Sequence, residues 1–458
     1  MKRTIILCLA LAACGDDGNP GTPNPTPDAS DPGNPPPTGG KTVRLNDDIK
    51  TNTTFTADNT YVIPRLKQLF VEPGATLTIE AGTKIQGEQG SVLVITRGAK
   101  IIAEGTKDKP IVFTTAQPEG QKTRGYWGGL LVLGAAPINV NVKSVPPSAE
   151  ATFEAFTSAV PEGKFGGTKA DDNSGVIKYV RIEFAGFNFV ADREFNNLTL
   201  CGVGSGTTID FVQVHGGSDD GIELFGGTVN VRHIISSQNG DDGFDTDNGW
   251  SGKAQFVIVQ NITPDGAREA SNGYESDNHA TAESYTAEPR TLPTIYNATI
   301  IGNHAYTGGT SFAAVLRRGT GGHYYNHIIT GFPSGIEMRD QATKDQADAG
   351  NLFFKSSIVF NNDVNNANFP PAQATGDIVE STYFQDPAWS NRFVDPGLPA
   401  DATSRTAPSF KPAANAAALT GGATPPNDGF FDTAATFVGA VGADDWTVGW
   451  TAYPQPTN

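Results

Sequence analysis

The chain has 458 residues, of which 32 are basic and 49 acidic, giving a formal net charge of −17 at neutral pH. This excess of negative charge disfavours nucleic acids and anionic membrane surfaces as partners, because both are negatively charged themselves. No stretch approaches the run of about 20 apolar residues that a membrane-spanning helix needs.

Residues 1–13 have the layout of a secretory signal peptide. Lys2 and Arg3 precede an apolar run from Ile5 to Leu11, and small residues follow up to Cys14. The four residues that end at Cys14 read LAAC and resemble the bacterial lipobox, whose cysteine receives diacylglycerol before cleavage. We therefore expect cleavage before Cys14 and a permanent anchor of diacylglycerol and palmitate there. The alternative is an ordinary secreted protein with a chance cysteine.

Processing at this site changes the charge and the thiol content. Loss of Lys2 and Arg3 leaves 30 basic residues against 49 acidic ones, a formal charge of −19. Cys8 leaves with the signal peptide and Cys14 is lipidated, so Cys201 is the single remaining thiol. An intramolecular disulfide is then impossible, and stability must come from packing or from metal ions.

The segment that follows the lipidated cysteine, residues 14–40, is predicted to be a flexible tether. Gly15 to Gly40 is crowded with Pro, Gly, Asp and Asn and has no large apolar side chain to bury. Asp16 and Asp17 resemble the export signals that carry some bacterial lipoproteins to the cell surface. We expect an outer-membrane protein exposed at the surface, with the periplasmic face as the alternative.

Residues 41–368 read as an all-β domain. Short β-branched runs are separated by Gly, Asn and Asp, and the stretch Val71–Thr115 alternates apolar and polar residues with glycine at each turn. Exposed strand edges invite aggregation, so the open end of such a domain needs a cover. We assign Val43–Ile63 as the first cap.

Seven later segments form a quasi-repeat. Their centres, spaced by 32, 22, 23, 42, 29 and 30 residues, are Val180, Val212, Ile234, Val257, Thr299, Ile328 and Ile358. A minimum period of 22 with variable insertions favours a parallel β-solenoid over a β-sandwich or a propeller. The general preference of parallel crossovers makes it a right-handed parallel β-helix.

The periodicity fades in residues 369–458, a region rich in Pro, Ala and Thr. We expect an irregular capping tail in which Trp446, Trp450 and Tyr453 dock on the solenoid instead of binding a ligand.

The densest chemical signal is a set of acidic residues in the repeat. Asp220 and Asp242 are 22 residues apart, as are Glu223 and Asp245, so each pair should stack in adjacent coils about 4.8 Å apart. Stacked like charges destabilise a sheet unless something neutralises them. The candidate ligands of a structural calcium ion are Asp219, Asp220, Glu223, Asp241, Asp242, Asp245, Asp247, Glu275 and Asp277.

Other readings of these acids stay open. Asp, Asn and Gly also form corners, where an Asp side chain accepts hydrogen bonds from nearby backbone N–H groups. Raised carboxyl pKa values or basic neighbours could neutralise the cluster without an ion. The six histidines lack any tight metal-ligand spacing, and His215 and His233 are expected to have satisfied polar roles instead of binding zinc.

A catalytic reading uses the same acids. Asp220, Asp241 and Asp242 lie in positions that resemble the acid residues of β-helical polygalacturonases, which act as general acid and base on a glycosidic bond. The Arg-Ile-Lys motif of that family is absent. A polysaccharide lyase would instead combine calcium with a basic residue, and the available bases are Lys253, Arg317, Arg318 and Arg339.

Several longer motifs together resemble one family. They include VEPGATLTIEAGTKIQG, YWGGLLVLGAAPIN, the DDGIELFGG and DDGFDTDNGWSGKAQF runs and the DDWTVGWT end. The chain is similar to bacterial outer-membrane lipoproteins related to a leptospiral surface lipoprotein. That resemblance implies a pectate-lyase-like fold and an outer-membrane location, and it implies no particular reaction.

Two functions are therefore expected from the sequence. The first is a surface lipoprotein with a calcium-stabilised β-helix that binds a glycan or a cell-surface protein, or serves as a structural element, without catalysis. The second is a carbohydrate-active enzyme, a lyase or a polygalacturonase-like hydrolase, that uses the stacked acids.

Overall fold

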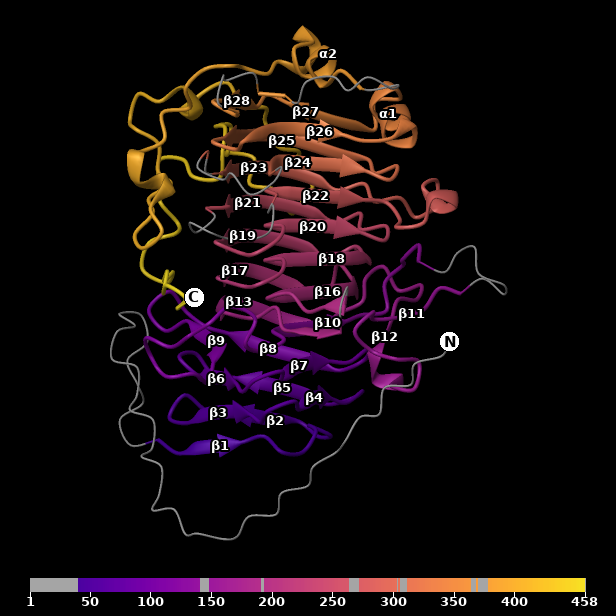
Figure 1. Ribbon diagram of the computed structural model, residues 1–458, viewed down its shortest axis with the longest axis vertical. Helices are drawn as coiled ribbons and strands as arrows, with labels where there is room; N and C mark the ends of the chain where they lie inside the picture. The colour runs from indigo at the N-terminus through magenta and orange to yellow at the C-terminus, as the bar shows by residue number, and fades with distance from the viewer. Residues whose placement is uncertain are drawn as a thin grey trace, which may run out of the picture.

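The computed structural model describes residues 40–140, 148–190, 193–262, 272–302, 304, 311–363, 368–369 and 378–457. The strands stack as successive coils along one axis, from the N-terminal strands at one end to the strands near residue 360 at the other (Figure 1). The architecture is a right-handed parallel β-helix, as the repeat predicts. The signal peptide, Cys14 and the tether up to residue 39 lie outside the described residues.

The larger of the two main sheets holds fifteen strands in the described part of the chain, and they pair in parallel. They are β1 (Thr42–Arg44), β2 (Thr53–Phe55), β3 (Thr60–Ile63), β5 (Thr76–Ile79), β6 (Lys84–Gly87), β8 (Lys100–Glu104), β9 (Ile111–Thr115), β13 (Gly175–Glu183), β17 (Thr208–His215), β19 (Asn230–Ser237), β21 (Lys253–Gln260), β23 (Thr294–Ile301), β25 (Gly322–Thr330), β27 (Leu352–Lys355) and β28 (Ile358–Phe360).

The second main sheet is also parallel and holds nine strands within the described ranges. They are β4 (Gln68–Val71), β7 (Val92–Ile95), β10 (Leu130–Leu133), β16 (Leu198–Val203), β18 (Ile222–Gly227), β20 (Phe244–Asp247), β22 (Tyr274–Asp277), β24 (Phe312–Arg317) and β26 (Ser334–Met338). Val43–Ile63, predicted as a cap, contains strands of the solenoid itself: β1 is the edge of the larger sheet, and β3 pairs with it as the first strand of the next coil.

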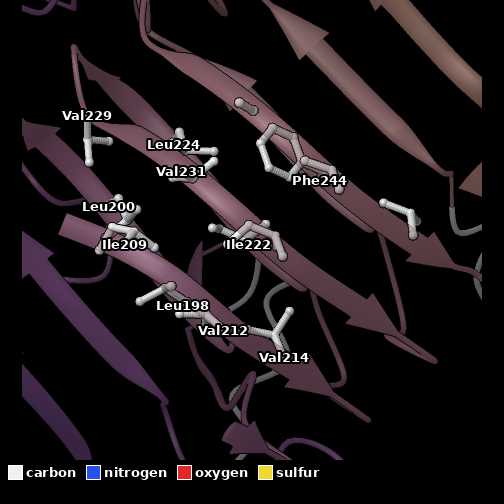
Figure 2. Close-up of a cluster of buried hydrophobic side chains, with 14 of the residues drawn as sticks. Leu198, Leu200, Ile209, Val212, Val214, Ile222, Leu224, Val229, Val231 and Phe244 are labelled. Carbon is white, nitrogen blue, oxygen red and sulfur yellow. The ribbon is translucent and has the colours of Figure 1, made fainter. Parts of the chain in front are cut away.

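The core lies between the two sheets and consists of aliphatic side chains that repeat from coil to coil. Ile222 and Leu224 from one sheet face Val212 and Val214 from the other, and all four are fully buried (Figure 2). Side chains alternate between the two faces of a strand, so the residues between these core positions point outward. The apolar residues of the 22-residue repeat therefore specify the inside of the solenoid.

Each long strand of the larger sheet turns a corner at one residue in the left-handed conformation. These residues have φ values between 49° and 61°; they are Tyr179, Phe211, His233, Phe256, Asn297, Asn326 and Ser356. Residues other than glycine adopt this conformation at a cost of about 1 kcal/mol or more. Stacking offsets that cost, because the rings of Tyr179, Phe211 and His233 lie 4.3 and 4.1 Å apart between centroids.

The strand pairing tests the predicted alignment of the repeats. Val180 pairs with Val212 and Ile234 with Val257, as predicted. One step is wrong: Val257 pairs with Ala298, not Thr299, so that interval is 41 residues. The long insertion between β21 and β23 hid the register at this step, and the alignment is correct again from Thr299 to Ile328 and on to Ile358.

An insertion after β10 covers the first part of the outer side of the nine-stranded sheet. It contains the short strands β11 (Ala151–Thr152) and β12 (Lys164–Phe165) and the 3-10 helix η1 (Pro161–Gly163). Phe153 and Phe156 of this insertion pack with Phe225 and the buried Cys201. A hairpin of β14 (Asn188–Val190) and β15 (Arg193–Glu194) precedes β16.

The region after β28 is irregular and returns along the outer side of the fifteen-stranded sheet (Figure 1). Its regular elements are short; they are α2 (Glu380–Phe384), η3 (Pro387–Trp389), η4 (Ala400–Thr403) and η5 (Ala417–Leu419), while α1 (Gln341–Asp348) and η2 (Ala282–Ser284) belong to earlier loops. No helix among the described residues is long and apolar enough to cross a membrane.

The predicted docking of the tail is confirmed. Trp450 is fully buried against Ile235 and Ile258, and Trp446 and Tyr453 pack against the same cluster. We call the outward side of β13 to β25 and the tail that covers it the tail face. On this face three side-chain amides each exchange two hydrogen bonds with one tail residue: Gln213 with Ala452, Gln255 with Asp432 and Asn326 with Ala423.

Candidate functional site

The predicted acids gather on the outward side of three neighbouring strands, β18, β20 and β22. In β18, Ile222 and Leu224 point into the core, so Glu223 between them points out. Glu223 pairs with Asp245 across β18 and β20, and Asp245 pairs with Glu275 across β20 and β22. The predicted stacking of Glu223 on Asp245 is confirmed. We call this surface, with its flanking corners, the acid face.

The two corner acids also hold the coils together. Asp220 Oδ1 accepts a hydrogen bond from the backbone N–H of Asp242 (2.8 Å), and Asp242 Oδ1 accepts one from the N–H of Asn272 (2.9 Å). Asn272 Oδ1 continues the ladder to the N–H of Phe312 (3.0 Å). This is the corner chemistry expected of Asp and Asn, and it accounts for one oxygen of each residue.

Sequence reasoning missed Asn272 as a member of this ladder. The signal was present, because Asp220, Asp242 and Asn272 are each followed by glycine and then by an apolar residue that begins a strand. A cluster defined by charge alone leaves out Asn272, whose neutral amide accepts the same kind of backbone hydrogen bond.

Burial makes the charged form of these acids unfavourable. Asp220, Asp242 and Asp245 are each exposed by less than a tenth, and Glu223 is mostly covered. Desolvation, aided by the neighbouring carboxylates, raises the pKa of each of these four groups well above its ordinary value. The same causes raise the pKa of Asp247 to about 8 and that of Glu275 to about 7.

Two arginines of the described chain pair with acids at one end of the acid face. Arg317, which pairs with Asp277 across β22 and β24, donates from Nε to Asp277 Oδ1 (2.8 Å) and from Nη2 to Glu275. Arg318 Nη1 donates to Asp277 Oδ2 (2.6 Å). Among the described residues no ion pair joins a basic side chain to Asp220, Glu223 or Asp245.

The carboxylate oxygens are close enough to share a cation. One oxygen each from Asp220, Glu223 and Asp245 lie within 4.8 Å of one another, and the same holds for Asp242, Asp245 and Glu275 and for Asp219, Asp220 and Asp241. Calcium binds oxygen at 2.3–2.6 Å, so two oxygens on one ion lie at most about 5 Å apart. The geometry fits this ion.

Asp245 gives an independent indication of a ligand. It belongs to two of the three groups, its side chain is more than nine-tenths buried, and its Oδ1 has no hydrogen-bond partner. A buried carboxylate oxygen without a partner is costly, and a bound cation would satisfy it.

The lyase alternative also named Lys253 as a base. The structure places Lys253 in β21 of the other sheet, where its Nζ donates to Asp428 of the tail (2.5 Å) and lies over the ring of Phe431. Asp220 and Asp241 do come together, with Asp242 in the next coil at the same corner. The fourth candidate base, Arg339, is paired with Glu337 (2.5 Å) one coil beyond Arg317.

The histidines named in the sequence serve the tail face. His215 is fully buried and bonds Ser237 Oγ through Nδ1 (2.9 Å) and the carbonyl of Pro454 through Nε2 (2.8 Å). His233 bonds Asp210 (2.7 Å) within the aromatic stack. Both have the satisfied polar roles that were expected.

The fold agrees with what a family comparison finds. A model of the pectate-lyase like beta helix domain matches residues 47–388. The chain belongs to this family. The match spans every strand from β2 to β28 and includes the whole acid face, so the family accounts for the solenoid and leaves its chemistry open. No curated protein and no solved structure matches the chain.

Proposed function

We propose that the protein is a surface-exposed outer-membrane lipoprotein, anchored at Cys14, whose β-helix is stabilised by calcium and acts as a binding or structural element without catalysis. The lipobox-like LAAC sequence and the Pro-, Gly- and Asp-rich tether that follows it support the anchor. A glycan or a cell-surface protein is the proposed partner of the solenoid.

The observation that carries the calcium proposal is the buried Oδ1 of Asp245. It lies without a hydrogen bond among carboxylates whose pKa values burial raises. An ion in the group of Asp220, Glu223 and Asp245 would join two coils through their side chains and remove their mutual repulsion.

The candidate bases Lys253 and Arg317 are engaged in ion pairs in the described part of the chain, which supports a role without catalysis. Lys253 is engaged by the tail, and Arg317 is bound to two carboxylates of the acid face. Asp242, the acid most deeply placed at the corner, already accepts a backbone hydrogen bond from the next coil. These contacts join neighbouring coils and hold the tail on the solenoid, which are structural roles.

Thermal unfolding tests the calcium proposal. The full chain, purified in detergent and freed of metal, should unfold at a higher temperature in 1 mM calcium than in chelator, because an ion that binds only the folded state stabilises it. At a hundredfold excess over the dissociation constant the gain is about 2.7 kcal/mol. Equal midpoints in the two buffers would remove the calcium proposal.

Two further measurements test the anchor and the role. Cys14→Ala should move the protein from the detergent phase to the aqueous phase in a phase-separation assay, whereas Cys201→Ala should leave it in the detergent phase. Incubation with uronate polymers should yield neither unsaturated products nor new reducing ends. Turnover that Asp242→Asn abolishes would establish the carbohydrate-active enzyme instead.

A further inference from the structure

Two of the three carboxylate groups of the acid face share Asp245, and they differ in what lies beside them. The first group is Asp220, Glu223 and Asp245; the second is Asp242, Asp245 and Glu275. They share Asp245 and lie one coil apart, since Glu223 pairs with Asp245 and Asp245 with Glu275. On spacing alone, each could hold one divalent cation.

The guanidinium of Arg317 reaches only the second group. Its Nη2 donates to Glu275 while its Nε donates to Asp277 (2.8 Å), so one planar cation bridges two carboxylates of the same strand. Arg318 completes the neutralisation of Asp277 from the other oxygen (2.6 Å). The positive charge beside Glu275 is therefore the guanidinium of Arg317.

The first group has no such internal cation within the described residues. Two of its members accept hydrogen bonds from neutral donors: Asp220 from the N–H of Asp242 and Glu223 from the amide of Asn196. The third member, Asp245, keeps an oxygen with no partner. In the first group, no positive charge offsets the three buried carboxyl groups. In the second group, the guanidinium of Arg317 offsets the charge of Glu275.

We infer that the acid face binds one divalent cation, between Asp220, Glu223 and Asp245, and that Arg317 occupies the place of a second ion at Glu275. This inference rests on the proposed calcium function and specifies its stoichiometry. The arginine sets the number of ions, because removing its charge frees Glu275 to complete the second group with Asp242 and Asp245.

Calcium titration calorimetry on the full chain tests the inference. The natural protein should bind one calcium ion, Arg317→Gln two, and Arg317→Lys one, because lysine keeps the charge. Arg339→Gln is the matched control, since it removes an arginine paired with Glu337 one coil away and should still bind one ion. Glu223→Gln should weaken binding at least tenfold.

The outcomes separate the inference from the function on which it rests. No calcium bound by the natural protein would overturn both, while two ions bound by it, or one by Arg317→Gln, would overturn only the inference. If Arg317→Gln folds only with calcium present, the ions that stay bound after gel filtration are counted by atomic absorption. Two per chain support the inference and one contradicts it.

Discussion

The tail face and the acid face are the outer sides of the same solenoid, and each buries polar groups in a different way. On the tail face, Gln213, Gln255 and Asn326 are neutral and exchange paired hydrogen bonds with the backbone of the tail. On the acid face, Asp245 is buried with an oxygen that lacks a partner. The chain itself satisfies the polar groups of the tail face, whereas for the acid face we propose that a bound cation does so.

This difference follows from the chemistry of the groups. An amide carries a donor and an acceptor, so a single backbone peptide can satisfy it in both directions. A carboxylate carries only acceptors when ionised, and a buried cluster of them needs protons or cations from elsewhere. Stability of the tail face should therefore depend on the tail, and stability of the acid face on solution conditions.

The largest expected effect comes from breaking the tail face. Trp450 is fully buried, and its ring meets Tyr179 and Phe211 edge-on at 5.8 and 6.0 Å. Trp450→Ala should lower the free energy of unfolding by about 3–5 kcal/mol, the usual cost of removing a buried aromatic side chain. Chemical denaturation measures this in calcium and in chelator, and the loss should be the same in both. Val448→Ala, at a side chain 58% exposed, is the control, with an expected change within about 0.5 kcal/mol.

The next effect comes from the acid face. Asp245 belongs to two of the sets of three carboxylates, so Asp245→Asn removes an acidic group from each set. The variant should have a higher unfolding midpoint than the natural protein in chelator. It should also lose most of the stabilisation by calcium, which is about 2.7 kcal/mol at a hundredfold excess over the dissociation constant. Asp108→Asn, at an exposed site, should keep the full calcium response. A normal calcium response in Asp245→Asn would show that the ion binds elsewhere.

The smallest expected effect is that of pH on the free energy of unfolding. The tail face and the acid face should respond to pH in opposite directions. Burial raises the pKa of Asp247 to about 8 and that of Glu275 to about 7, so their contribution is present at low pH and lost as pH rises through these values. Burial lowers the pKa of His215 to about 3, so its contribution is present above about pH 6.5 and lost as pH falls toward 3.

Each group should change the free energy of unfolding by about 1.4 kcal/mol per pH unit within its range. The unfolding midpoint, measured from pH 3 to 9 in metal-free buffer, should thus fall toward both ends of this range. Saturating calcium should flatten the alkaline side, because the ion takes the place of the protons, and His215→Gln should reduce the slope on the acid side. An alkaline decline that calcium leaves unchanged would contradict this account.

The parts of the molecule that sequence predicts are those that repeat without interruption. Glu223 and Asp245 are separated by one 22-residue coil, so their pairing follows directly from the period. Between Val257 and Ala298 a long insertion separates two coils, and the predicted register slipped by one residue there. A slip of one residue exchanges the two faces of a strand, so the predicted partner Thr299 lies on the tail face, where it accepts from the N–H of Ala440, and Ala298 lies in the core.

The partners of the charged residues were harder to predict. Lys253 binds Asp428 and Arg317 binds Asp277, which are contacts across 175 and 40 residues. The tail has no periodicity, and side-chain amides of the solenoid hold it through its backbone. Because every sequence has the same backbone groups, these contacts leave no signal in the sequence of the tail. Docking could be inferred from Trp446 and Trp450, but the path of the tail could not.

The tail is the last part of the chain to be synthesised, and it covers surfaces that are made much earlier. The stack of Tyr179, Phe211 and His233, and the buried pair of Arg181 and Glu183 beside it, are made long before the segment 446–457 that covers them. A chain that stops short of Trp450 leaves this aromatic and ionic surface open to water, and we expect proteases to cut it more readily than the full chain.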